Sequence, residues 1–438
     1  MKTTQFERFS FKPFIIDAIK ELGFYQPTDI QERIIPSIIN GESAVGQAQT
    51  GTGKTHAYLL PIFEKVNPSI QEVQTIITAP TRELATQIFH EARKIAAHFP
   101  EEEQVSVRCY VGGTDKNKAI DKLSKQPQIV IGTPGRINDL VREQALLVHT
   151  ATMIVVDEAD MMLDMGFIHD VDEIASRLAD KLQMLVFSAT VPEKLKPFMK
   201  KYMSNPRFFQ VEADQPTPKK ITHYLVPLRH RNELETIHEL AVMSNPYLMI
   251  IFANTKKKAD EIADYLLGEG LNVGRLHGDL NPRERKNVMK KIRNAQYQYV
   301  VATDLAARGI DIQGVSHVLN ANIPHHDLSF YIHRVGRSAR AEFSGEAITL
   351  YEARDEDALN KLEKMGVSFK HVDFRNQEWI DLGPRNKRKK RERGEDEIEK
   401  TAQKIVAKSK KVKPGYKKKR KRQVDQMKRK MKRNQRNK

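Results

Sequence analysis

The sequence predicts an α/β protein with two doubly wound, mostly parallel sheets in tandem, followed by a basic tail. Three observations predict this fold. Short apolar runs alternate with longer helical patterns between residues 40 and 375, a glycine-rich loop follows one of the first runs, and prolines interrupt the rhythm near its middle. A chain of 438 residues is long enough for two or three hydrophobic cores.

The order of apolar runs predicts the strands and the domain limits. In the first half we expect strands at residues 43–46, 75–79, 105–111, 129–132, 153–156 and 184–188. In the second half we expect them at 221–228, 248–253, 272–276, 299–303, 318–320 and 347–351. Pro216 and Pro218 mark the break between the halves. The expected divisions are a first domain at 1–208, a linker at 209–220, a second domain at 221–378 and a tail at 379–438.

Charge is distributed unevenly along the chain. Residues 384–438 contain 26 Lys and Arg against 6 Asp and Glu, a net charge of +20, whereas the rest of the chain has a net charge of −3. Such a tail has too few apolar residues to fold alone, so we expect it to be disordered and to bind the phosphate backbone of a nucleic acid. A solubilising or targeting tail remains an alternative. An anionic membrane surface is disfavoured, because no apolar helix face accompanies the charge.

Cysteine content and apolar runs bear on where the protein works. Cys109 is the sole cysteine, so no intrachain disulfide is expected and a reducing, cytoplasmic compartment is favoured. The N-terminus lacks the apolar run of a signal peptide, and an apolar stretch such as residues 248–253 is too short to span a bilayer. We expect a soluble protein.

A glycine-rich loop at residues 48–55 predicts a phosphate-binding site. It fits the phosphate-loop pattern loosely, but keeps the sequence Gly51-Thr52-Gly53-Lys54-Thr55 between a strand-like run and a helical one. Glycines allow backbone N–H groups to converge on phosphate oxygens. Lys54 would reach the outer phosphates, and the Thr55 hydroxyl would be a ligand of Mg²⁺. A glycine-rich turn before a basic helix is the simpler alternative.

Three carboxylates follow the expected strand at 153–156. Asp157, Glu158 and Asp160 would lie beside the loop, because ligands bind at the carboxyl ends of the strands in doubly wound sheets. Asp157 is placed to hold Mg²⁺ through water, and Glu158 to act as the general base for an attacking water. The alternative is an acidic loop that caps a helix, with Asp160 as the N-cap.

Taken together, these and further motifs resemble the DEAD-box ATP-dependent RNA helicases over about residues 1–375. The motifs occur in the family's order, at Gly23–Gln31, Ala48–Thr55, Pro80–Ala85, Gly112–Gly113, Thr133–Arg136, Asp157–Asp160, Ser188–Thr190, Phe252–Thr255, Thr303–Asp311 and His333–Arg340. The resemblance implies two RecA-like domains, the cofactors ATP and Mg²⁺, and hydrolysis of ATP stimulated by RNA. The basic tail is most similar to that of the smaller bacterial cold-shock helicases.

The resemblance also assigns residues to the site. For ATP it implies adenine recognition by Gln31, stacking of Phe6 on the base, a ribose contact from Asp311, and contacts from the whole loop, Ala48, Gln49, Thr50, Gly51, Thr52, Gly53, Lys54 and Thr55. Packing of Phe6 among neighbouring phenylalanines is the alternative. Arg337 and Arg340 match arginine fingers that reach the γ-phosphate. Ser188 and Thr190 match the motif that couples hydrolysis to strand separation.

On the RNA side, the resemblance implies backbone contacts that carry no base sequence. These residues are Arg82, Gly113, Thr133 and Arg136 in the first domain and Thr303 in the second. Ribosomal precursors, or RNA-decay and cold-shock proteins, are the implied partners. The chain departs from the family at Pro282, where glutamine is usual, which puts one contact of the second domain in doubt. Ser338-Ala339 replaces the usual Thr-Gly, with the arginine spacing kept.

Four functions are therefore open. The first is an RNA helicase that separates short duplexes locally and non-processively. The second is an RNA-stimulated ATPase that clamps RNA with little unwinding. The third is an RNA chaperone driven by the tail without ATP, which the phosphate loop and Glu158 argue against. The fourth, a translocating DNA helicase, would be stimulated by DNA as well as by RNA.

Overall fold

The computed structural model describes residues 4–49, 51–113, 116–211, 221–307, 312, 314–325, 327–338, 345–375, 378–385, 422–424 and 426–427. Thr50, Asp311 and Arg340 lie outside these ranges, as do residues 212–220 of the expected linker and nearly all of the basic tail. The chain divides into two units, residues 1–369 and 370–438. The domain limits expected from the sequence stay predictions.

The first sheet has seven parallel strands, in the order β3-β4-β2-β5-β6-β1-β7. Its strands are β1 Ala44–Gln47, β2 Thr75–Thr78, β3 Val107–Tyr110, β4 Ile129–Gly132, β5 Met153–Asp157, β6 Gln183–Ser188 and β7 Arg207–Gln210. Its helices are α1 Pro13–Glu21, α2 Asp29–Ile39, α3 Lys54–Lys65, α4 Arg82–Ala96, α5 Lys116–Asp121, α6 Pro134–Arg142, α7 Ala159–Asp164, α8 Ile168–Ala175 and α9 Lys196–Tyr202.

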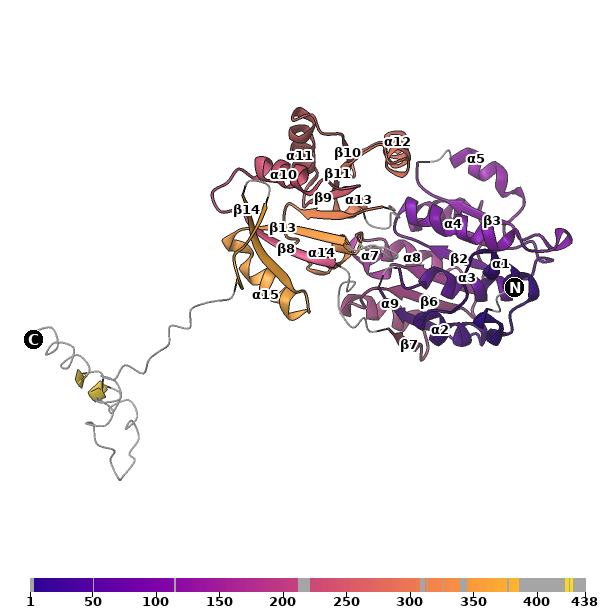
Figure 1. The fold of residues 1–438 in the computed structure, drawn as a ribbon. Coiled ribbons are helices and arrows are strands. Elements are labelled where there is room, and N and C mark those ends of the chain that lie inside the picture. The colour runs from indigo at the N-terminus through magenta and orange to yellow at the C-terminus, as the bar shows by residue number, and fades with distance from the viewer. Residues whose placement is uncertain are drawn as a thin grey trace, which may run out of the picture. The chain divides into compact units, whose positions relative to one another are not determined.

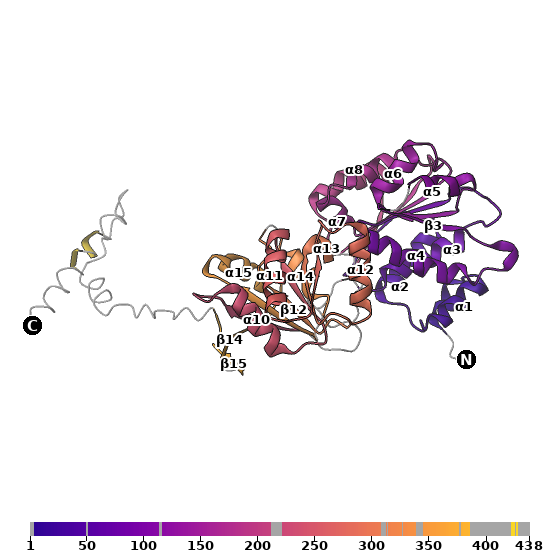
Figure 2. The ribbon, with the colours of Figure 1, turned by 90° about the horizontal axis from the view of Figure 1, so that it is seen from above.

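Alternate residues of each central strand enter different cores, which explains the two helical layers. Ile129 and Ile131 of β4 pack with α1 to α4, whereas Val130 packs with α6 to α9. Strands β5 and β6 alternate in the same way. Figure 2 shows α3 and α4 on one side of the strands and α6 and α8 on the other. Because both faces are covered, the central strands read as continuous apolar runs.

The second sheet repeats this design with six parallel strands, in the order β10-β11-β9-β12-β13-β8. Its strands are β8 Ile221–Pro227, β9 Met249–Ala253, β10 Val273–Leu276, β11 Tyr299–Thr303, β12 His317–Asn320 and β13 Gly345–Tyr351. Its helices are α10 Glu233–Ser244, α11 Lys256–Gly268, α12 Pro282–Arg293, α13 Asp304–Ala307, α14 Ser329–Val335 and α15 Glu356–Lys364. In Figure 1 the colour follows the chain, from indigo and purple in the first sheet to pink and orange in the second.

The prediction of two tandem, mostly parallel α/β sheets is confirmed, and the expected strands differ from those observed by at most two residues at either end. Three strands were missed. Strand β7 is a mostly exposed edge strand of four residues, and its apolar run is only Phe208-Phe209, shorter than those of the central strands. Strands β14 Phe369–Arg375 and β15 Glu378–Asp381 form an antiparallel pair in which only Val372 is buried. Within the part of the chain described, no helix is long and apolar enough to cross a membrane.

Candidate nucleotide-binding and catalytic site

The carboxyl edge of the first sheet gathers motifs that lie far apart in the sequence. The glycine-rich loop follows β1, the Asp157-Glu158 pair lies at the end of β5, and Ser188 ends β6. Because β5, β6 and β1 are neighbours in the sheet, these three motifs share one part of its edge. This is where ligands bind in open α/β sheets.

Glycine at position 53 is required by the shape of the loop. Gly53 precedes α3 with φ at +89°, a conformation that side chains disfavour. A Cβ added there would lie 2.7 Å from Gln31 Nε2 and 2.9 Å from Thr28 Oγ1. The loop therefore approaches the start of α2 closely, and it leads directly into the N-terminus of α3, a location suited to phosphate.

Lys54 is the first residue of α3, and its side chain is only 6% exposed. Its Nζ donates to the Ala48 carbonyl oxygen at 3.0 Å and to Glu158 Oε1 at 3.1 Å. Burial lowers the pKa of Lys54, but the negative charges of Glu158, Asp157 and Asp160 raise it overall above its usual value. The lysine thus remains a cation, as the predicted contact with outer phosphates requires.

Asp157 is buried at the tip of β5, with a donor on each carboxylate oxygen. Tyr58 Oη donates to its Oδ2 at 2.9 Å, and the backbone N–H of Glu158 donates to its Oδ1 at 3.0 Å. Burial, followed by the neighbouring charge of Glu158, raises the pKa of Asp157 to about 6. Glu158 itself has φ at +52°, a sparsely populated conformation that places its carboxylate against Lys54.

Asp160 joins the acidic motif to β6. Its backbone N–H donates to Ser188 Oγ at 3.0 Å, and its Oδ2 accepts from the Thr190 N–H and hydroxyl at 3.0 and 2.9 Å. Burial raises the pKa of Asp160, but the charges of His333 and Lys54 and these hydrogen bonds lower it overall. The alternative in which Asp160 is the N-cap is wrong, because Glu158 precedes the first residue of α7 and Asp160 is the second.

Gln31 and Phe6 have partners within the protein. Gln31 accepts from the Thr28 N–H at 2.9 Å, forming a capping box at the start of α2, and donates to the Gly53 carbonyl oxygen at 3.0 Å. Gln31 thus links the start of α2 to the phosphate loop. Its recognition of adenine stays a prediction. Phe6 lies in a short 3₁₀-helix, fully buried, with its ring 6.0 Å from that of Phe9. That position corresponds to the packing alternative, and stacking on a base stays a prediction.

The residues expected to bind RNA in the first domain lie around the turn after β3. Arg82, the first residue of α4, lies so close to Gly113 that an added Cβ would come within 2.5 Å of its Nη1. Arg136 Nε donates to the Val111 carbonyl oxygen at 3.2 Å. Thr133 precedes α6 at the carboxyl end of β4. Two guanidiniums and a turn with φ at +78° at Gly113 are therefore brought together.

In the second domain, a buried arginine that the sequence did not single out organises the strand ends. Arg334 is 1% exposed, and it donates to Asp304 Oδ2 at 2.6 Å, to Asn254 Oδ1 at 2.7 Å and to the Asn322 carbonyl oxygen at 2.6 Å. Asp304 and Asn254 directly follow β11 and β9. Polar residues at the carboxyl ends of two strands were therefore the sequence feature that could have indicated this cluster. Arg337 lies one turn beyond Arg334 and is buried, and Thr303 is buried at the end of β11.

Pro282, the departure noted in the sequence, begins α12. Asn281 Oδ1 accepts from the N–H groups of Arg283 and Glu284, and Glu284 Oε2 accepts from the Asn281 N–H. Proline is well tolerated at this first helical position, because its missing N–H would have no partner in the helix. Pro282 therefore does not disturb the helix, and the effect of losing the glutamine amide stays open to experiment.

The donor set at the loop fits Mg²⁺. Mg²⁺ usually takes one or two protein oxygens, with water and substrate phosphates completing its shell. The Thr55 hydroxyl and the Asp157 carboxylate are such oxygens: Thr55 follows Lys54 in the chain, and Asp157 is close enough for its charge to raise the pKa of Lys54. Over the described residues there is no cluster of three or more His, Cys, Asp or Glu side chains that would form an all-protein metal cage. The carboxyl edge of the first sheet therefore suits a cation that is coordinated partly by the phosphates of a bound nucleotide.

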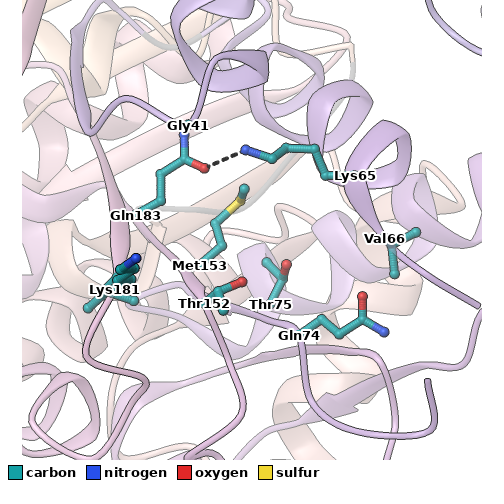
Figure 3. Close-up of a pocket in the computed structure, with 10 residues that line it drawn as sticks. Gly41, Lys65, Val66, Gln74, Thr75, Thr152, Met153, Lys181 and Gln183 are labelled. Atoms are coloured by element: carbon teal, nitrogen blue, oxygen red, sulfur yellow. Dashed lines mark hydrogen bonds between the residues drawn. The ribbon is translucent and has the colours of Figure 1, made fainter.

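A cavity of about 380 Å³ lies at the opposite, amino edge of the first sheet. Thr75, Met153 and Gln183, the first residues of β2, β5 and β6, line it together with Lys65. Figure 3 shows Lys65 directed at the Gln183 side chain, where its Nζ donates to Oε1 at 3.0 Å. None of the site residues expected from the sequence lines this cavity.

The fold and site define a phosphate-loop nucleoside triphosphatase with two tandem α/β domains. Residues 28–198 match the DEAD/DEAH box helicase family, and residues 232–342 match the helicase conserved C-terminal domain. The chain therefore belongs to the DEAD-box ATP-dependent RNA helicases.

Individual relatives agree with this assignment over most of their length. The chain is 57% identical to DEAD-box ATP-dependent RNA helicase CshB of Bacillus subtilis (strain 168) over 435 residues, which cover 99% of both chains. It is 45% identical to CshB of Staphylococcus aureus (strain NCTC 8325 / PS 47), covering 90% of this chain and 87% of that one. A structure of S. cerevisiae Dbp5 bound to RNA and ADP BeF3 matches with a TM-score of 0.76 at 29% identity, covering 85% and 96%.

Proposed function

We propose that this helicase separates short RNA duplexes locally and non-processively, and that ATP hydrolysis to ADP and phosphate drives release of the RNA. The observation that carries the proposal is the edge of the first sheet, where direct hydrogen bonds join Lys54 of the phosphate loop to Glu158, and Asp160 of the same acidic motif to Ser188 and Thr190. A change at the nucleotide can therefore reach β6 through Asp160. The likeness to Dbp5 bound to RNA supports an RNA substrate.

The contacts of Lys54 indicate how a nucleotide would assemble the site. In the structure, Lys54 Nζ donates to Glu158 Oε1 and to the Ala48 carbonyl oxygen. An outer phosphate carries more negative charge than one carboxylate, so it would take over the lysine and release Glu158. The freed carboxylate would then accept a proton from the attacking water. Mg²⁺, held by Thr55 and Asp157, would offset charge on the phosphates.

Arg337 and Arg340 of the second domain would complete the site by stabilising charge on the transferred phosphoryl group. Arg82, Gly113, Thr133, Arg136 and Thr303 would hold the RNA backbone. Backbone contacts carry no base sequence, so the core would act on many RNAs. The predicted limits, with domains at 1–208 and 221–378, place the arginines and the phosphate loop on different domains. Turnover would therefore require both domains.

The direct test is strand displacement on a short RNA duplex with a single-stranded extension. The wild type should displace the strand with ATP, and Lys54→Ala should not, because it removes the principal protein cation from the outer phosphates. ATP hydrolysis stimulated by RNA without displacement would favour the RNA clamp. Displacement that persists without ATP would favour the tail-driven chaperone. Equal stimulation by DNA would favour a DNA helicase.

We propose that residues 384–438 tether the enzyme to structured RNA, because the net charge of +20 is concentrated there. Each neutralised phosphate adds roughly 0.7–0.9 to the slope of log affinity against log salt. Deleting these residues should weaken RNA binding most at low salt and flatten that slope, with the turnover number at saturating RNA nearly unchanged. Unaltered affinity and slope would instead favour a solubilising or partner-binding tail.

The physiological role that we propose is cytoplasmic RNA unfolding during cold stress, ribosome assembly or mRNA turnover. Base pairing becomes more stable on cooling, so an ATP-driven unwinder would be needed most at low temperature. The likeness to the CshB proteins supports this placement. Crosslinking the protein to RNA in cells at two temperatures, and sequencing the bound RNA, would identify the substrates.

A further inference from the structure

Tyr58 touches the cation side of the nucleotide site, and neither the sequence motifs nor the family match assigns it a role. It lies in α3, one turn after Thr55, so the two side chains share a face of the helix. Its side chain is fully buried, with its ring 5.1 Å from that of Phe187. Its hydroxyl donates to Asp157 Oδ2 at 2.9 Å and also interacts with the Thr55 side chain.

The hydroxyl, rather than the ring, is the informative part of this residue. A phenylalanine would fill the same space between α3 and β6, and burying a hydroxyl is unfavourable unless it is hydrogen-bonded. Here the acceptor is the carboxylate of Asp157, which is expected to hold Mg²⁺. The other neighbour of the Tyr58 hydroxyl is the hydroxyl of Thr55, which is expected to bind the same ion. Thr55 belongs to α3 and Asp157 to β5, so Tyr58 links the two cation ligands from separate elements.

The bond also orients the carboxylate of Asp157. The Glu158 N–H donates to Oδ1 at 3.0 Å, and Tyr58 donates to Oδ2 at 2.9 Å. One donor on each oxygen fixes the plane of the carboxylate and leaves a lone pair on each oxygen for water or a cation. Without the tyrosine hydroxyl, the carboxylate would be held on one side only.

We propose that Tyr58 is a positioning residue for the Mg²⁺ side of the site, holding Asp157 in register with Thr55 so that Mg²⁺ and nucleotide bind together. This inference rests on the proposed function, because it takes Asp157 and Thr55 as the cation ligands. Its consequence is specific. Loss of the hydroxyl reduces the gain in nucleotide affinity that Mg²⁺ provides and leaves nucleotide binding without Mg²⁺ unchanged.

The experiment measures binding of a fluorescent ADP to the full chain, with EDTA and with increasing Mg²⁺. Tyr58→Phe should leave the affinity in EDTA unchanged and reduce the Mg²⁺-dependent gain by about ten- to a hundredfold, the range for one lost hydrogen bond to a charged group. The matched control is Tyr202→Phe. Tyr202 Oη also donates to an aspartate in the first domain, Asp172 Oδ1 at 2.8 Å, but on α9 and α8 rather than at the loop.

A double-variant cycle tests whether Tyr58 acts through Asp157. In the Asp157→Asn background, removing the tyrosine hydroxyl should have little further effect on the Mg²⁺-dependent gain. The inference is overturned if Tyr58→Phe keeps the wild-type gain, if Tyr202→Phe reduces it equally, or if the two losses simply add. Absence of any Mg²⁺-dependent gain in the wild type would instead contradict the proposed cation site itself.

A melting curve shows whether Tyr58→Phe folds. If it does not, a second measurement keeps the tyrosine hydroxyl in place. 3-Fluorotyrosine placed at position 58 keeps the hydroxyl and reports on its surroundings by ¹⁹F resonance. Its signal should move when Mg²⁺ is added to the ADP-bound protein, and the same label at position 202 should not respond. A label at position 58 that is insensitive to Mg²⁺ would also overturn the inference.

Discussion

The two sheets carry charged residues at the same place, the carboxyl ends of parallel strands, but hold them differently. At the edge of the first sheet, Lys54 is held by one carboxylate and one backbone carbonyl, and Glu158 adopts a left-handed backbone conformation. Burial and the charge of Glu158 raise the pKa of Asp157 there. At the edge of the second sheet, Arg334 is enclosed by Asp304, Asn254 and the Asn322 carbonyl oxygen.

This difference separates a site that is prepared for a ligand from one that is already complete. A phosphate could replace Glu158 as the partner of Lys54. A cation bound beside Asp157 would stabilise its negative charge, which is unfavourable where the carboxylate is buried. Arg334, by contrast, already forms short hydrogen bonds to a carboxylate, an amide and a carbonyl oxygen. A ligand would offer its guanidinium no better acceptors. We therefore propose that the reacting groups lie at the edge of the first sheet, and that the Arg334 network of the second sheet supports Arg337.

The largest expected effect tests the arginine presented by the second sheet. Arg337→Ala should bind ATP nearly normally and hydrolyse it roughly 10³–10⁵ times more slowly, because an arginine finger acts on the transition state. Single-turnover hydrolysis with saturating RNA measures this. Arg337→Lys keeps the charge without the planar fork, and should also be slow. Because Arg337 is buried, melting curves must show that both variants fold. Unchanged hydrolysis would remove Arg337 from the catalytic residues.

The next effect tests the reactive edge of the first sheet. Glu158→Gln should reduce ATP turnover by about 10²–10⁴, the usual contribution of a general base. ATP and RNA should still bind, and the complex should be long-lived, because glutamine keeps the shape of the side chain and loses only the proton acceptor. Glu103→Gln, at an exposed position in the same domain, is the control. Wild-type turnover in the Glu158 variant would refute its assignment as base.

A stability measurement tests whether the second edge is structural. Arg334→Ala should lower the free energy of unfolding by about 3–5 kcal/mol, because it removes a buried arginine and leaves the partly buried Asp304 without that partner. Arg275→Ala removes a more exposed arginine that pairs with Asp260 and Asp264 in the same domain, and should lower it by about 0–1 kcal/mol. Chemical denaturation of each variant gives the comparison. Equal losses would mean that the Arg334 network is not special.

The smallest effect tests the unfavourable burial of Asp157. Its folded pKa of about 6 lies above the ordinary value of 3.8, so the folded state binds the proton more tightly and stability falls as pH rises between these values. Asp157→Asn removes this titration. Without nucleotide or Mg²⁺, the variant should be more stable than the wild type at pH 8 by up to about 3 kcal/mol, and equally stable near pH 3. A difference independent of pH would contradict the raised pKa.

Several features of this protein could be predicted from its residues alone because they depend on local patterns. Buried strands such as β4 and β5 are continuous apolar runs, and glycine-rich or acidic sequences directly follow them. The loop at Gly51–Thr55 and the Asp157-Glu158 pair were recognisable because phosphate and cation binding need particular residue types in close sequence. Motif order then placed both sheets in one family. Strand β7 was missed because this edge strand is short and mostly exposed, and its two phenylalanines do not form the longer apolar run of a central strand.

The sequence by itself therefore determined the two sheets, the phosphate loop and the family. Tertiary structure alone decided which residues meet: Tyr58 with Asp157, Asp160 with Thr190, and Arg334 with Asn254. These pairs are separated by 99, 30 and 80 positions, and nothing in a local pattern links them. The strand order β5-β6-β1 creates the first two contacts, and it is set by packing both faces of the sheet against helices. Burial then gives those contacts their strength, because a polar group removed from water must find its partner within the fold.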